Sequence, residues 1–258
     1  MINVLNENKE SNFLIICDHA SKFIPLEYKN LGLGEDVLDT HIAYDIGAKE
    51  VASHISNSLQ CPLVMSGFSR LLIDPNRGID DPTLIMKVSD GSVIKGNKKI
   101  SYLSDCEDKI NRINLYNAYH KKISELINKS ILRGVFPAII SIHSFTPFWR
   151  ERKRLIELGI LWDSDDRLPN IFFNYLKRYE NQLIIGDNQP YSGRMRNDTL
   201  FRHGTRFGLP NILIEVRQDL ISNKKGQKYF AKLIAKPLLE NNNNYELFQK
   251  KIYKSLAI

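Results

Sequence analysis

The sequence predicts a single α/β domain that spans residues 1–258. Two short apolar runs, at residues 13–16 and 138–142, are bounded by polar or turn-forming residues, as buried parallel strands usually are. The chain of 258 residues is 43% hydrophobic, enough for a large core, and no shift in composition divides it into halves. We therefore expect one core built around a sheet that contains parallel strands.

The segment after the first strand is expected to form a helix and then a second strand. A helix is predicted over residues 36–59, because apolar side chains recur at helical spacing from Tyr44 to Leu59. His41 and Asp45 lie four residues apart on an adjoining face of that helix. The second strand is predicted at residues 63–66. The Asp-Pro and Arg-Gly steps that follow indicate a turn that displays two arginines, Arg70 and Arg77.

A long polar segment with several glycines, residues 79–103, comes next. Its length is unusual for a passive connection, so we expect a lid or a small hairpin. Ser104 and Glu107 then form a capping box, which predicts the start of a helix. The apolar side chains expected to face inward from this helix are Ile113, Ile123 and Ile127.

The second half of the chain is expected to supply the remaining strands. Strands are predicted at residues 155–162 and 182–186, with a helix at 167–179 between them. A final strand at 211–217 alternates so that Glu215 and Arg217 face the same side as Leu213. A carboxylate in such a strand is costly to bury unless it is paired or used. Two helices, at 222–240 and 245–258, are expected around an asparagine-rich break.

Composition and charge exclude several classes of function. Three cysteines without a Cys-x-x-Cys spacing argue against a disulfide framework and a structural zinc knuckle. The net charge of +7 comes from scattered lysines rather than a basic block, so we expect no nucleic-acid partner, and a small anionic substrate fits the charge. No run of eighteen apolar residues occurs and the N-terminus is polar, so we expect a cytoplasmic protein without a membrane partner. The oligomeric state stays open.

Each of the first two apolar runs is followed by a histidine, His19 after the first and His143 after the second. In open α/β sheets the carboxyl ends of the strands form the edge where ligands bind. Imidazole is the commonest metal ligand, and two imidazoles with a carboxylate leave zinc one position for water. The pair therefore points to a metal-dependent hydrolase. A single histidine at a strand end is more often a hydrogen-bonded structural residue.

Six short motifs, taken together and in order, closely resemble those of the N-formylglutamate amidohydrolase family, over about residues 13–220. The motifs are Cys-Asp-His-Ala-Ser at 17–21, Asp-Thr-His-Ile-Ala-Tyr-Asp-Ile-Gly-Ala at 39–48, Ser-Arg-x-x-x-Asp-x-Asn-Arg at 69–77, Ile-His-Ser-Phe-Thr at 142–146, Asn-x-Pro-Tyr-Ser-Gly at 188–193, and Glu-Val-Arg-Gln-Asp-Leu at 215–220. Each motif is weak alone, but six in the family's order form a specific signal.

The resemblance implies a fold and a reaction. The family is similar to the zinc carboxypeptidases, which implies a three-layer α/β/α sandwich of the phosphorylase/hydrolase-like type with a mostly parallel, mixed central sheet. The implied reaction is hydrolysis of N-formyl-L-glutamate to formate and glutamate by a Zn²⁺-activated water. Other N-acyl amino acids or small peptides are alternative substrates.

The resemblance also suggests roles for individual residues. His19 and His143 are the expected metal ligands, and Asp45 is expected to complete the set. The carboxypeptidase-type His-x-x-Glu is absent, with Lys22 at the position of its glutamate, so the carboxylate ligand is the least firmly assigned of the three. Glu215 is the candidate general base. The remaining candidates are Arg70 as a catalytic residue, Asn76 and Arg77 as the grip on a substrate carboxylate, Tyr191 as a hydrogen-bonding partner of the substrate, and Arg217 as a contender with Arg70 for a second carboxylate.

Each assignment has an alternative. Asp45 could instead orient His41 or His19, and the adjacent Asp18 could be the third ligand. The other structural alternatives are a salt bridge of Glu215 with Arg217 or Arg70, a turn-capping role for Arg77 and a packing role for Tyr191. Two functional alternatives also remain, a cysteine hydrolase with Cys17 as the nucleophile and a non-catalytic protein that binds a small acid.

Overall fold

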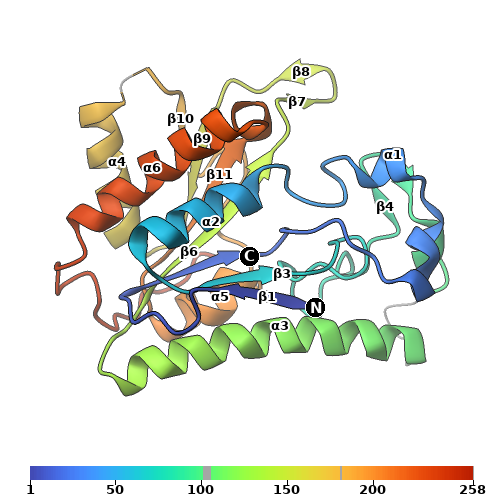
Figure 1. Ribbon diagram of the computed structural model, residues 1–258, viewed down its shortest axis with the longest axis horizontal. Coiled ribbons are helices and arrows are strands. Elements are labelled where there is room, and N and C mark those ends of the chain that lie inside the picture. Colours follow the sequence, from blue (N-terminus) through green and yellow to red (C-terminus); the bar gives the residue numbers. More distant parts are fainter. Residues whose placement is uncertain (101–105, 181, 258) are drawn as a thin grey trace.

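A seven-stranded mixed sheet forms the centre of the molecule in the computed structural model, which describes residues 1–100, 106–180 and 182–257 (Figure 1). The strand order is β1-β3-β2-β6-β11-β9-β10. Neighbouring strands run parallel from β3 through β2 and β6 to β11, and again between β9 and β10. The edge strand β1 is antiparallel to β3, and β11 is antiparallel to β9. The bounds are β1 Ile2–Leu5, β2 Phe13–Cys17, β3 Leu63–Ser66, β6 Ala138–Phe145, β9 Leu158–Leu161, β10 Ile185–Asp187 and β11 Asn211–Arg217.

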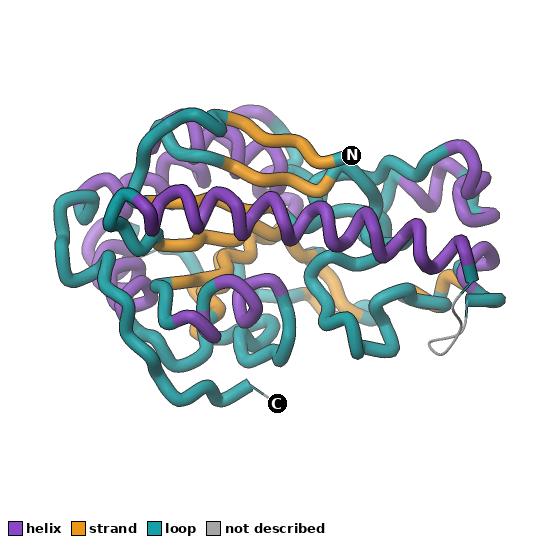
Figure 2. Tube along the Cα trace, turned by 90° about the horizontal axis from the view of Figure 1, so that it is seen from below, coloured by secondary structure: helices purple, strands orange, loops and turns teal. Residues whose placement is uncertain are grey.

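Helices cover both faces of this sheet, which confirms the predicted three-layer α/β/α sandwich. One face packs against α2 (Ala48–Leu59), α4 (Arg167–Tyr179) and α6 (Lys224–Glu240). The opposite face packs against α3 (Glu107–Leu132) and α5 (Thr199–His203), and α3 runs along most of the molecule in Figure 2. The side chains of β11 alternate as predicted, because Ile212, Ile214 and Val216 enter the α2/α6 core while Leu213 enters the α3 core.

Shorter elements connect these layers. The helix α1 (Glu35–Leu38) and the 3₁₀ segments at Leu26–Gly32, Lys95–Asn97, Thr205–Phe207 and Gln218–Ile221 lie in the connections. A hairpin of β4 (Val88–Ser89) and β5 (Ser92–Val93) turns at Asp90 and Gly91, so the hairpin expected within residues 79–103 is present, and residues 101–103 of that segment lie outside the described residues. A second hairpin, β7 (Phe148–Trp149) with β8 (Arg152–Lys153), projects beyond the sheet in Figure 1.

The helix predicted over residues 36–59 is wrong in its first half. The chain forms only the four-residue α1 and then a series of turns before α2 begins at Ala48. Gly47 adopts a left-handed conformation with φ of 80°, and a Cβ there would lie 2.4 Å from the carbonyl oxygen of Ile221. The apolar periodicity continues through this break. Asp45 therefore lies in a loop and not on a helix face with His41.

The helix predicted at residues 245–258 is also wrong, because this tail runs as turns and extended chain. Its backbone groups pair with distant side chains instead of with each other. Arg167 donates to the carbonyls of Leu247 and Gln249 at 3.0 and 2.6 Å, and Asp163 accepts from the amide of Leu256 at 2.7 Å. These bonds satisfy the groups that a helix would have used.

Other boundaries differ by a few residues. The helix α3 begins at Glu107 with Cys106 as its N-cap residue, and Ser104 of the predicted capping box lies outside the described residues. The strand β9 is shorter than predicted, and β10 begins three residues later. The strand β6 runs to Phe145, so His143 lies inside the strand and not after its end.

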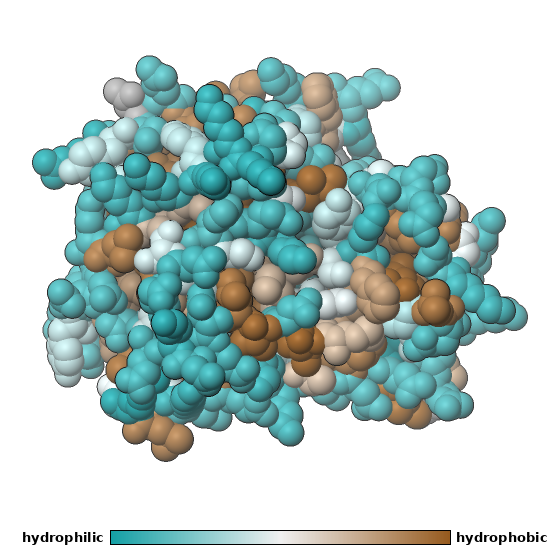
Figure 3. Space-filling view, in the orientation of Figure 1, coloured by the Kyte–Doolittle hydropathy of each residue, from teal (hydrophilic) through white to brown (hydrophobic). Residues whose placement is uncertain are grey.

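The face of the molecule seen in Figure 3 is mainly hydrophilic. Among the described residues, no helix combines the length and the apolar character needed to cross a membrane. The face in Figure 3 is dominated by hydrophilic side chains, with hydrophobic ones in small groups between them. This distribution agrees with helices that turn their apolar sides toward the sheet.

Candidate active site

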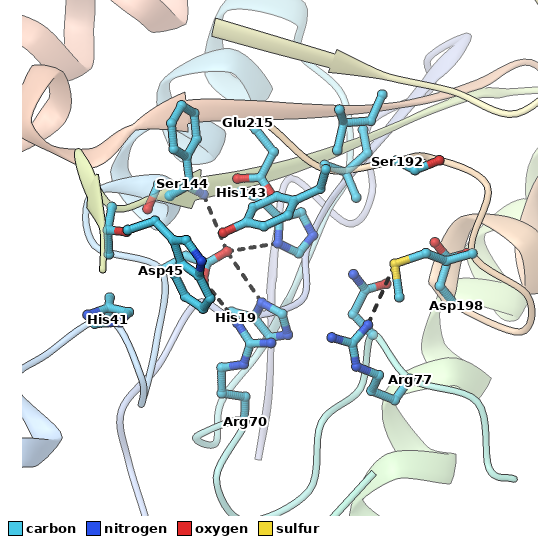
Figure 4. Close-up of a pocket in the computed structure, with 18 residues that line it drawn as sticks. His19, His41, Asp45, Arg70, Arg77, His143, Ser144, Ser192, Asp198 and Glu215 are labelled. Atoms are coloured by element: carbon cyan, nitrogen blue, oxygen red, sulfur yellow. Dashed lines mark hydrogen bonds and ion pairs between the residues drawn. The ribbon is translucent and has the colours of Figure 1, made fainter. Parts of the chain in front are cut away.

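A cavity of about 230 Å³ opens at the carboxyl edge of the parallel strands (Figure 4). Its walls come from the loop after β2, the loop after β3, the carboxyl halves of β6 and β11, and the segment at residues 191–198. This is the edge at which the sequence predicted the site. The predicted residues that line the cavity are His19, Asp45, Arg70, Asn76, Arg77, His143, Tyr191 and Glu215.

Two imidazoles converge on one carboxylate inside this cavity. The Nδ1 atoms of His19 and His143 lie 3.3 and 2.8 Å from Oδ2 of Asp45. All three side chains are buried, and one potential ligand atom from each lies within 4.8 Å of the others. His19, Asp45 and His143 could therefore hold a metal ion. Asp45 contacts His19 and His143, whereas His41 pairs with Asp90 at 3.1 Å.

Each imidazole is held from behind by a second carboxylate. Nε2 of His19 lies 2.7 Å from Asp74, and Nε2 of His143 lies 3.1 Å from Asp18. A proton on each Nε2 can donate to its carboxylate, so that with a cation bound between the three groups each Nδ1 lone pair would be free to ligate it. Outer carboxylates fix the tautomer and the ring orientation of metal-binding histidines in this way. Asp18 thus lies on the outer side of His143, and Asp45 is better placed to be the third ligand.

The local backbone explains how the three side chains meet. The amide of Asp45 donates to the carbonyl of His19 at 2.9 Å, and the amide of Ser144 donates to Oδ2 of Asp45 at 3.3 Å. The loop before α2 is therefore attached to the chain after β2 and to β6. Because β2 and β6 are parallel neighbours, His19 and His143 emerge on adjacent strands, with ring centroids 4.9 Å apart.

The charges of these groups support one another. Burial by itself would raise the pKa of Asp45 and Asp18, but the two histidines lower the Asp45 pKa below its usual range, and the hydrogen bond from His143 helps to lower the Asp18 pKa to about 2. Burial likewise opposes charge on the imidazoles, yet the neighbouring carboxylates raise the pKa of both His19 and His143. The pocket between the three carboxylates therefore attracts positive charge.

The donor set fits a divalent metal ion. Asp18, Asp45 and Asp74 are all buried, and within the described residues Arg70 is the arginine that pairs with two of them, Asp74 at 2.9 Å and Asp45 at 3.6 Å. With neutral imidazoles this leaves an excess of two negative charges. Two nitrogen ligands and one carboxylate oxygen are a common set for zinc.

Glu215 lies beside this group on the central strand β11. It is in register with His143 on β6, so both side chains point to the same face of the sheet. The carboxylate is buried, and its Oε2 atom has no hydrogen-bond partner within the described residues. Burial is the largest cause that raises the Glu215 pKa to about 7. A buried carboxylate of this kind can accept or donate a proton near neutral pH. Neither Arg70 nor Arg217 forms a salt bridge with it.

The loop after β3 presents two groups that can bind an anion. Oδ1 of Asn76 accepts from the amide of Thr199 at 3.1 Å, which directs the Nδ2 group of Asn76 away from that amide. Arg77 makes a 3.6 Å contact to the sulfur of Met195 and forms no salt bridge within the described part of the chain. The unpaired guanidinium and amide line the cavity together. The carbonyl of Arg77 also accepts from Tyr116 at 2.7 Å, which holds the turn in place.

Tyr191 and Arg217, the two other predicted substrate contacts, differ in position. Tyr191 lines the cavity, and its hydroxyl accepts from Arg154 at 2.9 Å. Arg217 lies outside the cavity wall. Its guanidinium donates to Asp219 at 2.8 Å and lies 3.6 Å from Glu157, so the substrate contact predicted for it has no support in this geometry.

Sequence reasoning did not assign three buried carboxylates of the site to their structural roles. Asp18 and Asp74 orient the histidines, and both belong to motifs that were recognised, at 17–21 and 69–77. Asp198 lines the cavity and caps α5, and burial raises its pKa to about 7. Cys17, the alternative nucleophile, is fully buried in the α2/α6 core and does not line the cavity.

Comparisons with known proteins support the assignment to a family. The family model described as N-formylglutamate amidohydrolase matches residues 11–222, a span that contains every candidate site residue. The crystal structure of gene product Atu2144 from Agrobacterium tumefaciens is 34% identical, covers 93% of this chain and 95% of that chain, and has a TM-score of 0.85.

A second solved structure shares the fold. It is N-formylglutamate amidohydrolase from Ralstonia eutropha JMP134, with 19% identity, coverage of 95% of this chain and 98% of that chain, and a TM-score of 0.67. The comparison with curated proteins gives no match. The family match over most of the chain leads to one conclusion: this chain belongs to the N-formylglutamate amidohydrolase family.

Proposed function

We propose that this chain is a zinc-dependent amidohydrolase that cleaves N-formyl-L-glutamate, or a closely related N-acyl acidic amino acid, into formate and the free amino acid. Family membership supports a hydrolytic enzyme. One observation carries the proposal: the group of His19, Asp45 and His143 shares a cavity with Glu215, whose Oε2 atom has no hydrogen-bond partner among the described residues.

The metal would be held by Nδ1 of His19, Nδ1 of His143 and a carboxylate oxygen of Asp45. When bound, zinc lowers the pKa of a bound water toward ~7 and polarises a carbonyl. Asp74 and Asp18 keep the imidazoles in the ligating tautomer. Removal of such outer partners typically weakens metal binding by roughly 10- to 100-fold.

Glu215 acts as the general base and then as the general acid. Its carboxylate accepts a proton from the attacking water and passes that proton to the nitrogen of the leaving amino acid. No described residue donates a hydrogen bond to Oε2 of Glu215, so this atom is free to accept the proton. A positioned acid or base of this kind contributes about 10²- to 10⁴-fold in rate.

The arginines of the cavity have separate tasks. Arg77 and the Nδ2 group of Asn76 bind the α-carboxylate of the substrate, since no carboxylate among the described residues pairs with Arg77 and the Asn76 side chain is engaged only through its Oδ1 atom. Arg70 is fixed by Asp45 and Asp74, and it stabilises the negative charge that develops on the carbonyl oxygen of the scissile amide.

The test measures formate release from N-formyl-L-glutamate and from a panel of formylated and acetylated amino acids. Glu215→Gln is expected to lower kcat by about 10²- to 10⁴-fold while the zinc content is unchanged. Glu50→Gln, an exposed position on α2, is the matched control and should retain wild-type activity. Chelation should abolish activity, and added Zn²⁺ should restore it.

Two results would contradict the proposal. Full activity of Glu215→Gln would remove the assigned base. Tight calorimetric binding of the panel without turnover, in a protein loaded with zinc, would instead indicate a protein that only binds small acids.

A further inference from the structure

Arg77 and Arg154 are two arginines near the cavity whose charge is not already paired. Arg70 and Arg217 are both neutralised by carboxylates. Within residues 1–100, 106–180 and 182–257, neither Arg77 nor Arg154 forms such a pair. Arg77 belongs to the loop after β3, whereas Arg154 follows β8 at the base of the projecting hairpin. A substrate with two carboxylates needs two such cations.

Arg154 lies among side chains that form the cavity wall. Its Nη1 atom donates to the hydroxyl of Tyr191 at 2.9 Å and lies 3.4 Å from the carbonyl of Thr146. The guanidinium carbon lies 5.1, 5.4 and 5.5 Å from the ring centres of Tyr191, Trp149 and Phe145. All four neighbours line the cavity, and Arg154 lies in contact with these lining residues without being one of them. The aromatic rings hold the guanidinium by cation–π contact and orient it for pairing with an anion.

Arg217 holds the backbone of Arg154 in place through hydrogen bonds to its carbonyl group and to that of the next residue. Nη1 of Arg217 donates to the carbonyls of Arg154 and Leu155 at 3.2 and 3.3 Å, and Asp219 holds Arg217 in place. The amide of Arg154 also donates to Pro147 at 2.8 Å across the hairpin. Only Nη1 of Arg154 is hydrogen-bonded among the described residues, so Nε and Nη2 remain available to a ligand.

We infer that Arg154 is the residue that selects acidic substrates, by binding the side-chain carboxylate of an N-acyl dicarboxylic amino acid while Arg77 binds the α-carboxylate. The inference rests on the proposed function and specifies its substrate class. It replaces the expectation that Arg70 or Arg217 binds the second carboxylate. Arg217 contributes indirectly, since it positions the backbone of Arg154.

The experiment compares N-formyl-L-glutamate with N-formyl-L-glutamine, which has the same shape without the side-chain charge. Wild-type enzyme should prefer the glutamate compound in kcat/KM. Arg154→Gln should lower kcat/KM for N-formyl-L-glutamate by roughly 10- to 100-fold, the usual size for a lost charge-assisted bond, and change that for the glutamine compound less than about threefold. Arg154→Lys should reduce kcat/KM for N-formyl-L-glutamate by a smaller factor, because lysine keeps the positive charge but lacks the two parallel N–H donors of the guanidinium.

Arg152→Gln is the matched control. Arg152 lies on the same hairpin with an exposed side chain, and its replacement removes the same charge. An equal loss in both variants would show general attraction by the hairpin and would overturn the inference. A parallel loss for both substrates in Arg154→Gln would also overturn it, because it would indicate a structural role.

The inference and the proposed function can fail separately. Hydrolysis of both compounds at equal rates by the wild type would refute selection by Arg154 and uphold the amidohydrolase. If neither compound is hydrolysed, the proposed function fails. Calorimetry then tests the inference: the wild type should bind N-formyl-L-glutamate more tightly than N-formyl-L-glutamine, and Arg154→Gln should lose this preference.

Discussion

Replacing Asp18 with asparagine is expected to weaken zinc binding by roughly 10- to 100-fold, the effect typical of a lost outer carboxylate. Oδ2 of Asp18 accepts from Nε2 of His143 at 3.1 Å and from Ser141 at 3.0 Å, and Oδ1 accepts from Tyr119 at 3.1 Å and Thr199 at 2.7 Å. An asparagine offers only one oxygen for these four donors. At ~1.4 kcal/mol per factor of ten, the loss is about 1.4 to 2.8 kcal/mol of binding free energy.

The geometry indicates why the variant should still fold. Hydroxyl groups can rotate to accept a bond, whereas Nε2–H of His143 can only donate, so the asparagine oxygen should remain on the His143 side. The new amide group then faces Thr199, whose hydroxyl still has the carbonyl of Pro75 at 3.1 Å as an acceptor. The main loss is the negative charge that makes His143 a better ligand.

The measurement is zinc affinity by competition with a chromophoric chelator, with thermal unfolding of the metal-free protein as the check on folding. Asp163→Asn is the matched control, because Asp163 is also buried but accepts from Ser255 and Leu256 in the C-terminal tail. A zinc affinity of Asp18→Asn within twofold of the wild type would refute the assigned role of Asp18.

Three further predictions concern other parts of the molecule. Cys17→Ala should keep hydrolytic activity within about twofold and cost about 0.5–1.5 kcal/mol of stability, because Cys17 is a core side chain; loss of turnover would favour a thiol nucleophile. Burial lowers the pKa of His203 from 6.5 to about 4, so the unfolded chain binds more protons below pH 6.5 and stability should fall by roughly 3 kcal/mol as the pH drops from 6.5 through 4. In urea unfolding, His203→Gln should reduce this acid dependence, and an unchanged slope would contradict the burial argument. Gly193→Ala should destabilise the protein by about 1–3 kcal/mol, because a Cβ there would lie 2.2 Å from the amide nitrogen of Trp162; an unchanged melting temperature would show that the loop adapts.

Local patterns predicted the central strands well, and the failures have physical causes. The strands β2, β3, β6 and β11 are buried along their whole length, so their apolar runs are conspicuous in the sequence. The edge strand β1 was not predicted, because its polar surroundings resemble a loop and its pairing partner β3 lies about 60 residues away. The tail after α6 is ordered by contacts with Arg167 and Asp163, which no local pattern reveals.

The sequence predicted which residues form the candidate site better than it predicted the hydrogen bonds between them. The motifs identified the residues that meet in the cavity, because each motif contributes a polar side chain near one edge of the sheet. Which carboxylate faces which imidazole nitrogen depends on ring orientations, and these follow from tertiary contacts of Asp18 and Asp74. The role of Arg217 was likewise not predictable from its motif, because its side chain pairs with Asp219, which lies beyond the end of β11.

Glu215 lies on a central strand of the sheet, whereas the residues proposed to recognise the substrate lie in connecting segments. The strand β11 is hydrogen-bonded to β6 on one side and to β9 on the other, so the proposed base is carried by one of the least deformable parts of the fold. Arg77, Tyr191 and Arg154 belong instead to connecting segments, which tolerate sequence change more readily. We therefore expect relatives to diverge in the acid they accept while keeping the reaction, since recognition can be rebuilt on the loops without moving the groups that perform the chemistry.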